Sequence, residues 1–300
     1  MIDLHIHSTY SDGTKNVLEI LKQAQNLKLD TISITDHENC DAYKELSKMN
    51  LKEIYSGKII NGIELKSQYK DRIIDILGYN INCDKMNSYV KECYKENSRE
   101  KIQEKQLEEF YKYGIKYGLT LKPINDLEWD KKKDWGSMVF YRELKSHEEN
   151  RLKVPEDLWE SVKNFKRNYY HIKGKMFYTN ISKYYPKLDK ILEIIHNSDG
   201  IACIAHIHEY TWMEDKISEL NAITKEFNID GIECYYSNFT EEQTNELINY
   251  CNQNNLLISG GSDYHGNNKP EISLGIGKGN LQVPSNIIDN WNKVKQLNYV

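Results

Sequence analysis

The chain contains 300 residues with a formal net charge of −5, 39% hydrophobic residues and six cysteines. This length can bury a large core without disulfides, and no apolar run approaches the length of a membrane-spanning helix. The cysteines form no C-x-x-C pair, and the chain opens on a strand pattern in place of a hydrophobic leader. We therefore expect reduced core cysteines in a soluble, cytoplasmic protein.

Charge is distributed unevenly along the chain. Residues 85–195 contain 24 Lys and Arg against 18 Asp and Glu. The two flanking parts together contain 16 Lys and Arg against 27 Asp and Glu. A basic segment carried on an acidic body predicts that the middle segment covers or guides an anionic substrate. A solvated, lysine-rich helical surface would show the same composition.

The first thirteen residues predict a strand that ends in candidate metal ligands. Hydrophobic residues alternate with Asp3, His5 and His7, so both imidazoles leave the strand on the same face. The turn residues that follow place Asp12 where it can direct a third ligand over the strand end. A strand with two half-buried histidines would show the same pattern, so the His-x-His motif alone leaves both interpretations open.

Helices and strands alternate through most of the remaining chain. We expect helices at 17–27, 41–49, 188–195 and 240–254, one more helix between 205 and 231, and strands at 31–35, 58–65, 72–78, 201–205, 231–236 and 256–259. With the opening strand, seven strands and their intervening helices predict a parallel α/β sheet that is closed, or nearly closed, into a barrel.

Residues 85–195 interrupt this alternation. They are charged and aromatic, show helical periodicity and contain turn residues such as Gly114 and Pro155. We expect a mainly helical, basic insertion domain between the fourth and fifth strands that covers the active site. Residues 1–84 and 196–300 would then form the catalytic domain.

Metal-binding side chains lie at the ends of the predicted strands or in the loops just after them. In a parallel barrel these ends meet at one face, and a multinuclear metal site needs several imidazoles and a carboxylate that bridges two ions. Each residue alone is more often structural, but the set together predicts metal binding: His5, His7, Asp12, His37, Glu64, His206, Asp263 and His265.

These motifs resemble those of the PHP (polymerase and histidinol phosphatase) family of metal-dependent phosphoesterases. They are most similar to its TrpH-like branch, which acts on nucleotide and short RNA phosphoesters. The matching segments are Asp3-Leu-His-Ile-His7, Ser11-Asp-Gly13, Ile34-Thr-Asp-His37, Gly62-Ile-Glu64, Ala205-His206 and Gly261-Ser-Asp-Tyr-His265-Gly266. The resemblance implies a distorted (β/α)7 barrel with an insertion between the fourth and fifth strands and two or three divalent ions of Mn, Fe or Zn.

The resemblance also implies how the ligands divide among the ions. It assigns His5, His7 and Asp263 to one ion, Glu64 as a bridge to a second ion that also uses His206, and Asp12, His37 and His265 to a third. It implies hydrolysis of nucleotide or short oligonucleotide phosphoesters by a metal-activated hydroxide, with Glu64, Asp263 and His265 as catalytic residues.

Two positions depart from the family pattern. Asp75 stands where the relatives usually place a histidine, so it is either a harder ligand of the second ion or a residue that merely faces the barrel interior. Glu209 stands where a phosphate-binding arginine is common, so either another cation replaces it or the substrate differs. Candidate replacements that could bind the substrate are Arg99, Arg142 and His208. Arg99 could equally form a surface salt bridge with a neighbouring glutamate.

Other residues near the motifs have weaker assignments. Glu233 at the end of a strand is expected to support a ligand histidine. Tyr10, Tyr235 and Tyr264 flank the ligand motifs and could face a base or sugar, or simply pack. Three histidines outside every motif are expected to be ordinary surface or interface residues: His147, His171 and His196.

Three alternatives to an oligonucleotide phosphoesterase remain open. The substrate could be histidinol phosphate or another small phosphomonoester. An amidohydrolase-like reaction usually needs a bridging lysine, whereas Glu64 holds that position here. A non-catalytic, metal-binding regulatory protein would account for Asp75 and Glu209. We expect a small anionic phosphoester, such as a nucleotide or a short RNA or DNA, as the partner, and no membrane; the sequence leaves the oligomeric state open.

Overall fold

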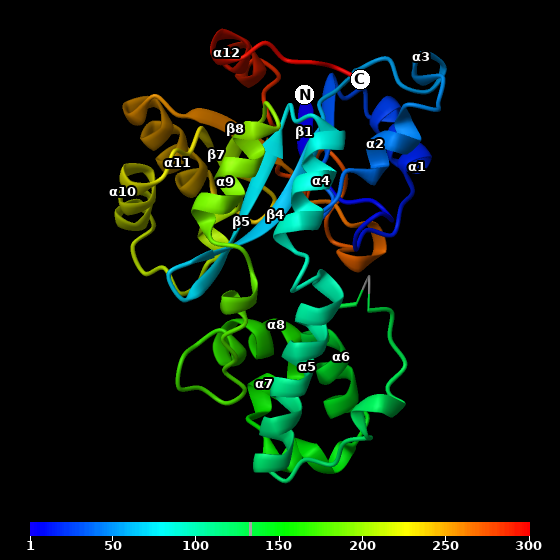
Figure 1. The fold of residues 1–300 in the computed structure, drawn as a ribbon, viewed down its shortest axis with the longest axis vertical. Coiled ribbons are helices and arrows are strands. Elements are labelled where there is room, and N and C mark those ends of the chain that lie inside the picture. Colours follow the sequence, from blue (N-terminus) through cyan, green and yellow to red (C-terminus); the bar gives the residue numbers. More distant parts are fainter. Residues whose placement is uncertain (132–133) are drawn as a thin grey trace. The chain divides into compact units, whose positions relative to one another are not determined.

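The computed structural model describes residues 1–131 and 134–300, which contain eight strands in two sheets (Figure 1). One sheet has the order β1-β2-β3 and the other β4-β5-β6-β7-β8. The strands are β1 Ile2–Ile6, β2 Thr31–Ile34, β3 Lys58–Ile59, β4 Gly62–Tyr69, β5 Arg72–Tyr79, β6 Ile201–Ile204, β7 Gly231–Tyr236 and β8 Leu257–Gly261.

Helices occupy most of the connections between strands. Their bounds are α1 Val17–Asn26, α2 Asp41–Leu46, α3 Leu51–Ile54, α4 Cys83–Cys93, α5 Arg99–Lys116, α6 Gly136–Lys145, α7 Glu156–Glu160, α8 Val162–Asn164, α9 Leu188–Asn197, α10 Lys216–Glu226, α11 Glu241–Asn254 and α12 Ile287–Val294. α9 contacts β4 and β6, and α11 contacts β7 and β8 (Figure 1). Within the described residues, no helix combines the length and apolarity needed to cross a membrane.

Two of the predicted helices begin at capping boxes. The Asn16 side chain accepts a hydrogen bond from Glu19 N at 2.9 Å, and the Glu19 carboxylate accepts one from Asn16 N at 2.9 Å. Thr240 and Gln243 form the same reciprocal pair at the start of α11. These pairs satisfy backbone N–H groups that have no partner within a helix, which explains why the helices begin close to the predicted residues.

The predicted all-parallel sheet is wrong at β5, which runs antiparallel to its neighbours β4 and β6. β5 pairs with β6 in the antiparallel direction, with Ile76 opposite Ile204 and Gly78 opposite Ala202. Only two residues separate β4 from β5, which is too short for the crossover that a parallel pair requires. The β1-β2, β2-β3, β6-β7 and β7-β8 pairs are parallel.

The predicted third strand, 58–65, is also two strands in the structure. β3 pairs with β2, and β4 belongs to the other sheet. The buried Tyr43 hydroxyl occupies the break between them. It accepts hydrogen bonds from Gly62 N at 2.7 Å and Ile34 N at 3.1 Å, and its single proton is shared between the carbonyl oxygens of Ile34 at 2.7 Å and Ile60 at 2.9 Å. One side chain thus satisfies the backbone groups that the break releases.

The two sheets do not close into one continuous barrel, which corrects the predicted closed arrangement. Isolated parallel bridges connect their edges: Ile6 pairs with Tyr264 beyond β8, and His37 beyond β2 pairs with Glu64 in β4. The main chain of His7 donates to the Tyr264 carbonyl at 2.9 Å. The ends of β1 and β2 are therefore joined to the five-stranded sheet at the positions where the predicted ligands lie.

The chain forms two compact units. The first contains residues 1–69, 73–93 and 186–300, and its core includes Leu4, Leu77 and Trp291. The second contains residues 70–72 and 94–185. Its aromatic core is formed by Phe110, Phe140, Phe165, Tyr170 and Phe177, together with aliphatic neighbours.

The second unit is shorter than the predicted insertion of residues 85–195. α4 and α9, which were predicted to lie in the insertion wholly or in large part, contact each other and belong to the first unit. Their apolar residues explain this placement, because Met86 of α4 and Ile191 and Ile195 of α9 are buried.

We predict that Tyr43→Phe lowers the free energy of unfolding by about 1–3 kcal/mol, because it leaves buried backbone groups at the break without their partner. Urea unfolding followed by circular dichroism measures the change. Tyr55→Phe is the matched control, since among the described residues the buried Tyr55 hydroxyl makes one hydrogen bond, to Leu29 O at 2.8 Å. An equal or smaller loss for Tyr43→Phe than for Tyr55→Phe would contradict the assigned role.

Candidate metal centre

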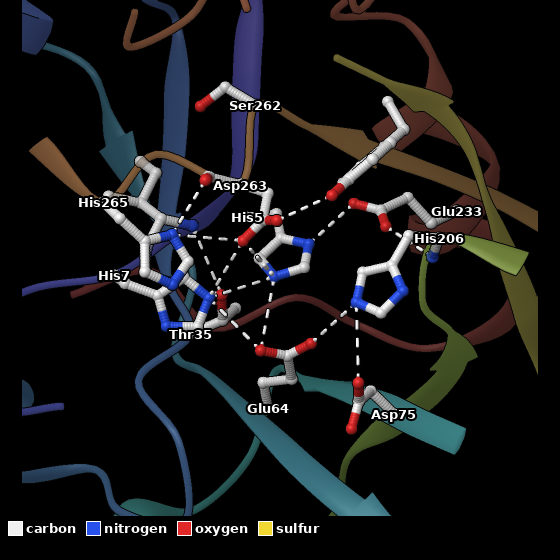
Figure 2. A network of polar contacts seen from close by, with 12 residues as sticks. His5, His7, Thr35, Glu64, Asp75, His206, Glu233, Ser262, Asp263 and His265 are labelled. Carbon is white, nitrogen blue, oxygen red and sulfur yellow. Dashed lines mark hydrogen bonds and ion pairs between the residues drawn. The ribbon is translucent and has the colours of Figure 1, made fainter. Parts of the chain in front are cut away.

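The histidines of the opening strand are fully buried and face each other (Figure 2). His5 Nε2 and His7 Nε2 lie 3.2 Å apart. His5 Nδ1 lies 2.8 Å from Glu233 Oε1, so the carboxylate holds the ring proton on Nδ1 and leaves the Nε2 lone pair directed into the cluster. This is the arrangement of a metal-ligating imidazole supported by a carboxylate.

Glu64 lies among histidines from several strands. Its Oε2 is 3.2 Å from His7 Nε2 and 3.1 Å from His37 Nδ1, and its Oε1 is 3.2 Å from His206 Nε2. Both oxygens of the carboxylate are therefore engaged on different sides (Figure 2). This is the geometry that a carboxylate bridging two ions requires.

Asp263 approaches the same histidines from the end of β8. Its Oδ1 lies 3.5 Å from His5 Nε2, 3.4 Å from His7 Nε2 and 3.3 Å from His265 Nδ1. The Asp263 backbone has a φ of 58°, a left-handed conformation that aspartate adopts more readily than most residues. Gly261 allows the close approach of β8 to β1, because a Cβ there would lie 2.3 Å from His5 N.

Two further groups of candidate ligands lie at the ends of the cluster. At one end, Asp12 Oδ1 is 3.2 Å from His265 Nε2 and 3.7 Å from His37 Nε2. At the other end, Asp75 Oδ2 is 3.7 Å from His206 Nε2. The remaining Asp75 oxygen accepts a hydrogen bond from the ammonium of Lys66 at 2.9 Å.

All nine predicted ligands thus lie in one contiguous cluster of the first unit. Eight of them have ligand atoms within 4.8 Å of one another in three overlapping groups: His7, Asp12, His37 and His265; His5, His7 and Glu64; and Glu64, Asp75 and His206. Asp263, the ninth, adjoins these groups through His5, His7 and His265. Two ligands of one ion lie roughly 3.0–3.4 Å apart when the metal–ligand bonds are about 2.1 Å. The donor separations of 3.1–3.7 Å and the mixture of imidazole and carboxylate donors fit divalent cations.

The electrostatics of the cluster also favour a bound cation. Burial favours the protonated forms of Asp12, Glu64 and Asp263, but the neighbouring histidines, together with a lysine at Asp263, hold the pKa of each carboxyl well below its usual value. Burial lowers the pKa of His5, but Glu233 and the other carboxylates outweigh it and raise this pKa well above its usual value. Burial, by contrast, lowers the pKa of His37 and of His265. The carboxylates thus favour positive charge at His5, and a divalent cation can supply that charge in place of the proton.

Two buried aspartates that sequence reasoning left unassigned hold the loops around the cluster. Asp3 accepts hydrogen bonds from Ser262 Oγ at 2.6 Å and from Gly275 N at 2.7 Å. Asp36 accepts from Ser8 Oγ at 2.6 Å and from Ser11 Oγ at 2.5 Å. In the sequence, Asp3 lies within the opening strand and Asp36 just after the second strand, and serines in the ligand loops are their partners.

Other residues that contact the ligands were also missed. The Tyr236 hydroxyl donates to Asp263 Oδ2 at 2.7 Å, and the Lys269 ammonium forms an ion pair with the same oxygen. Lys66 contacts Asp75. None of these residues belongs to a motif, so only the tertiary structure identifies them. The structure places Glu233, which was expected to support a histidine, against His5 and against the main chain of His206 at 2.8 Å.

The predicted substrate-binding residues are divided between the units. In the second unit, the Arg99 guanidinium lies 4.4 Å from the centre of the Trp135 ring, and Arg142 lies 3.3 Å from Asp134. In the first unit, His208 Nε2 lies 3.7 Å from a carboxylate oxygen of Glu246. These contacts do not test a role in substrate binding, which stays a prediction.

The three tyrosines that flank the ligand motifs and the three histidines outside the motifs differ in exposure and in contacts. Tyr10 is 39% exposed, Tyr235 packs against the core of the first unit, and the Tyr264 hydroxyl donates to Gln23. The histidines outside the motifs have local contacts: His147 with Glu143, His171 with Tyr170 and His196 with Asp230.

Two bacterial relatives match this chain over nearly its whole length. A 5′-3′ exoribonuclease of Haemophilus influenzae is 26% identical over 291 residues, which cover 97% of this chain and 98% of the relative. The 5′-3′ exoribonuclease Rnm of Escherichia coli is 24% identical over 299 residues, which cover 96% of this chain and 92% of the relative.

Solved structures share the α/β fold. A protein of Bifidobacterium adolescentis, provisionally classed as a metal-dependent phosphoesterase, has a TM-score of 0.66 and 17% identity over 97% of this chain and 95% of its own. An amidohydrolase from Chromobacterium violaceum, solved with bound sulfate and no metal, has a TM-score of 0.63 and 20% identity. The match covers 88% of this chain and 87% of the amidohydrolase chain.

The PHP domain family model matches residues 3–239, a span that includes most of the clustered histidines and carboxylates. The resemblance inferred from the motifs is confirmed, and the chain belongs to the PHP domain family.

Proposed function

We propose that this protein is a metal-dependent phosphoesterase that hydrolyses phosphoester bonds of a nucleotide or short oligonucleotide. The observation that carries the proposal is the position of Glu64, whose two oxygens lie 3.1 Å from His37 and 3.2 Å from His206 on different sides of the carboxylate. The names of the two bacterial relatives, both 5′-3′ exoribonucleases, support nucleic acid as the substrate class. The cytoplasmic location stays a prediction.

Two or three ions of Mn, Fe or Zn are the proposed cofactors. His5, His7 and Asp263 would hold the first ion, and Glu64, His206 and Asp75 the second. The third would be held by Asp12, His37 and His265. When bound, such ions activate a water molecule and polarise the phosphoryl oxygens for in-line displacement.

The chain's own residues hold this arrangement in place. Glu233 orients His5 through Nδ1, and its second oxygen accepts a hydrogen bond from the His206 main chain at 2.8 Å. The backbone of His206 has a φ of 29°, an uncommon conformation for a residue with a side chain. We infer that Glu233 stabilises this conformation and so fixes two ligands at once.

Hydrolysis of a substrate panel tests the proposed function. With Mn present, we expect release of nucleotide from short RNA with a 5′ phosphate, because phosphodiester substrates fit a multinuclear site and the relatives are exoribonucleases. The panel also contains AMP, 3′,5′-bisphosphonucleotides and histidinol phosphate. Turnover of histidinol phosphate alone would support a small-substrate phosphatase instead, and no turnover of any compound would support a non-catalytic protein.

Elemental analysis of protein purified without chelator tests the cofactor proposal. We expect two or three transition-metal ions per chain, because the ligands form three groups that share His7 and Glu64. Dialysis against EDTA should remove the metal and the activity together, and added Mn should restore both. A metal content below one ion per chain after growth and purification with Mn would contradict the proposed mechanism.

Replacing single ligands tests the residue assignments. His7→Ala and Asp263→Ala should each lower kcat/KM at least about 10³-fold, because they remove ligands placed between several others. Circular dichroism should show an intact fold. His196→Ala is the control, since His196 pairs with Asp230 outside the cluster, and it should retain activity. Activity within tenfold of the unsubstituted protein in either ligand variant would mean that the ligand set is wrong.

A further inference from the structure

Lys269 places a positive charge beside the candidate metal centre. It follows the short helical turn Gly266–Asn268, and its ammonium forms an ion pair with Asp263 Oδ2. The Lys269 side chain is 34% exposed, whereas that of Asp263 is 5% exposed. The side chain of Lys269 thus extends from a partly exposed position to the buried carboxylate, at the edge of the cluster.

The position of Asp263 does not depend on this lysine alone. The buried Tyr236 hydroxyl, from strand β7, donates to the same Asp263 oxygen at 2.7 Å. Asp263 N also donates to the His5 carbonyl at 2.8 Å. A strand residue and the main chain thus already orient the carboxylate, so the lysine is available for a second purpose.

The Lys269 ammonium has unused hydrogen-bonding capacity. An ammonium carries three N–H donors. Across the described ranges 1–131 and 134–300, the structure gives Nζ a single hydrogen-bond partner, Asp263 Oδ2. Two donors remain for a ligand or water, and an anion with several oxygens is the ligand that uses them best.

The loop that carries Lys269 is held against the segment that carries Asp12. The Asn268 side chain donates to the Asp12 carbonyl at 2.6 Å, and Asn267 N donates to Thr14 Oγ1 at 2.8 Å. The main chain of Lys269 accepts from Ile272 N at 2.9 Å. These contacts position the base of the side chain, so less conformational entropy is lost when its ammonium binds a ligand.

A fixed positive charge in this place opposes the binding of divalent cations nearby. An anionic substrate removes this conflict, because its charge lies between the ammonium and the ions. We propose that Lys269 binds a non-bridging oxygen of the substrate's phosphoryl group while it stays paired with Asp263. The proposal rests on the proposed phosphoesterase function and adds a substrate-contacting residue to it.

Binding of inorganic phosphate to the Mn-loaded protein tests the proposal without turnover. By calorimetry, Lys269→Met should weaken phosphate binding about tenfold to a hundredfold, because it removes a charge-assisted hydrogen bond. Its Mn content should equal that of the unsubstituted protein, and Lys269→Arg should recover part of the affinity. Lys278→Met, at an exposed position in a neighbouring loop, is the matched control and should bind phosphate normally.

Tyr236→Phe separates contact with the anion from support of Asp263. Tyr236→Phe removes the other donor to the same oxygen. If Lys269 only supported Asp263, Lys269→Met and Tyr236→Phe would lower the Mn content and the phosphate affinity to the same extent. That result would overturn the proposal, as would unchanged phosphate binding in Lys269→Met. Failure of the Mn-loaded, unsubstituted protein to bind phosphate would also overturn it.

Kinetics give an independent readout with whichever compound of the panel is hydrolysed. Lys269→Met should lower kcat/KM about a hundredfold, since a donor aimed at the reacting group acts mainly in the transition state. An unchanged kcat/KM would contradict a contact with the reacting phosphoryl group. If no compound is hydrolysed, the phosphoesterase proposal fails, and the phosphate titration still decides whether Lys269 binds the anion.

Discussion

The meeting of buried imidazoles around the Glu64 carboxylate is the constraint on which the site depends. Glu64 is 2% exposed, and a buried carboxylate costs several kcal/mol of desolvation unless it is paired. His7 and His37 reach it from the ends of β1 and β2 in the three-stranded sheet, and His206 reaches it from the end of β6 in the other sheet. The two sheets must therefore meet where the charges balance, and the bridge between His37 and Glu64 lies at that point.

Local patterns in the sequence were sufficient to predict most of the candidate ligands. The alternation of β1 placed His5 and His7 on one face, and their Nε2 atoms lie 3.2 Å apart. Strands that end in a polar residue bring that residue to the shared edge, which explains why His37 and Asp263 could be identified without knowledge of the fold. Apolar periodicity likewise located α1 and α11, and the structure adds the capping boxes at which they begin.

Features that depend on long-range packing could not be predicted in this way. The reversal of β5 is not one of them, because the predicted strands 58–65 and 72–78 already left only six residues between them, too few for a parallel crossover. Lys269 and Tyr236 reach Asp263 from a loop and from a different strand, and neither belongs to a recognisable motif. Such contacts are decided by the folded arrangement, so their residue types carry no local signal.

The exchange of a histidine for Asp75 becomes understandable when Lys66 is considered with it. The Lys66 ammonium lies 2.9 Å from one Asp75 oxygen, and the other oxygen lies 3.7 Å from His206 Nε2. A neutral imidazole contributes no net charge to a metal site, and an aspartate paired with a lysine contributes none either. The pair can thus preserve the charge of the site while presenting an oxygen donor, which favours Mn or Fe over softer, nitrogen-preferring ions. The departure at Asp75 is therefore compatible with metal binding by the group Glu64, Asp75 and His206.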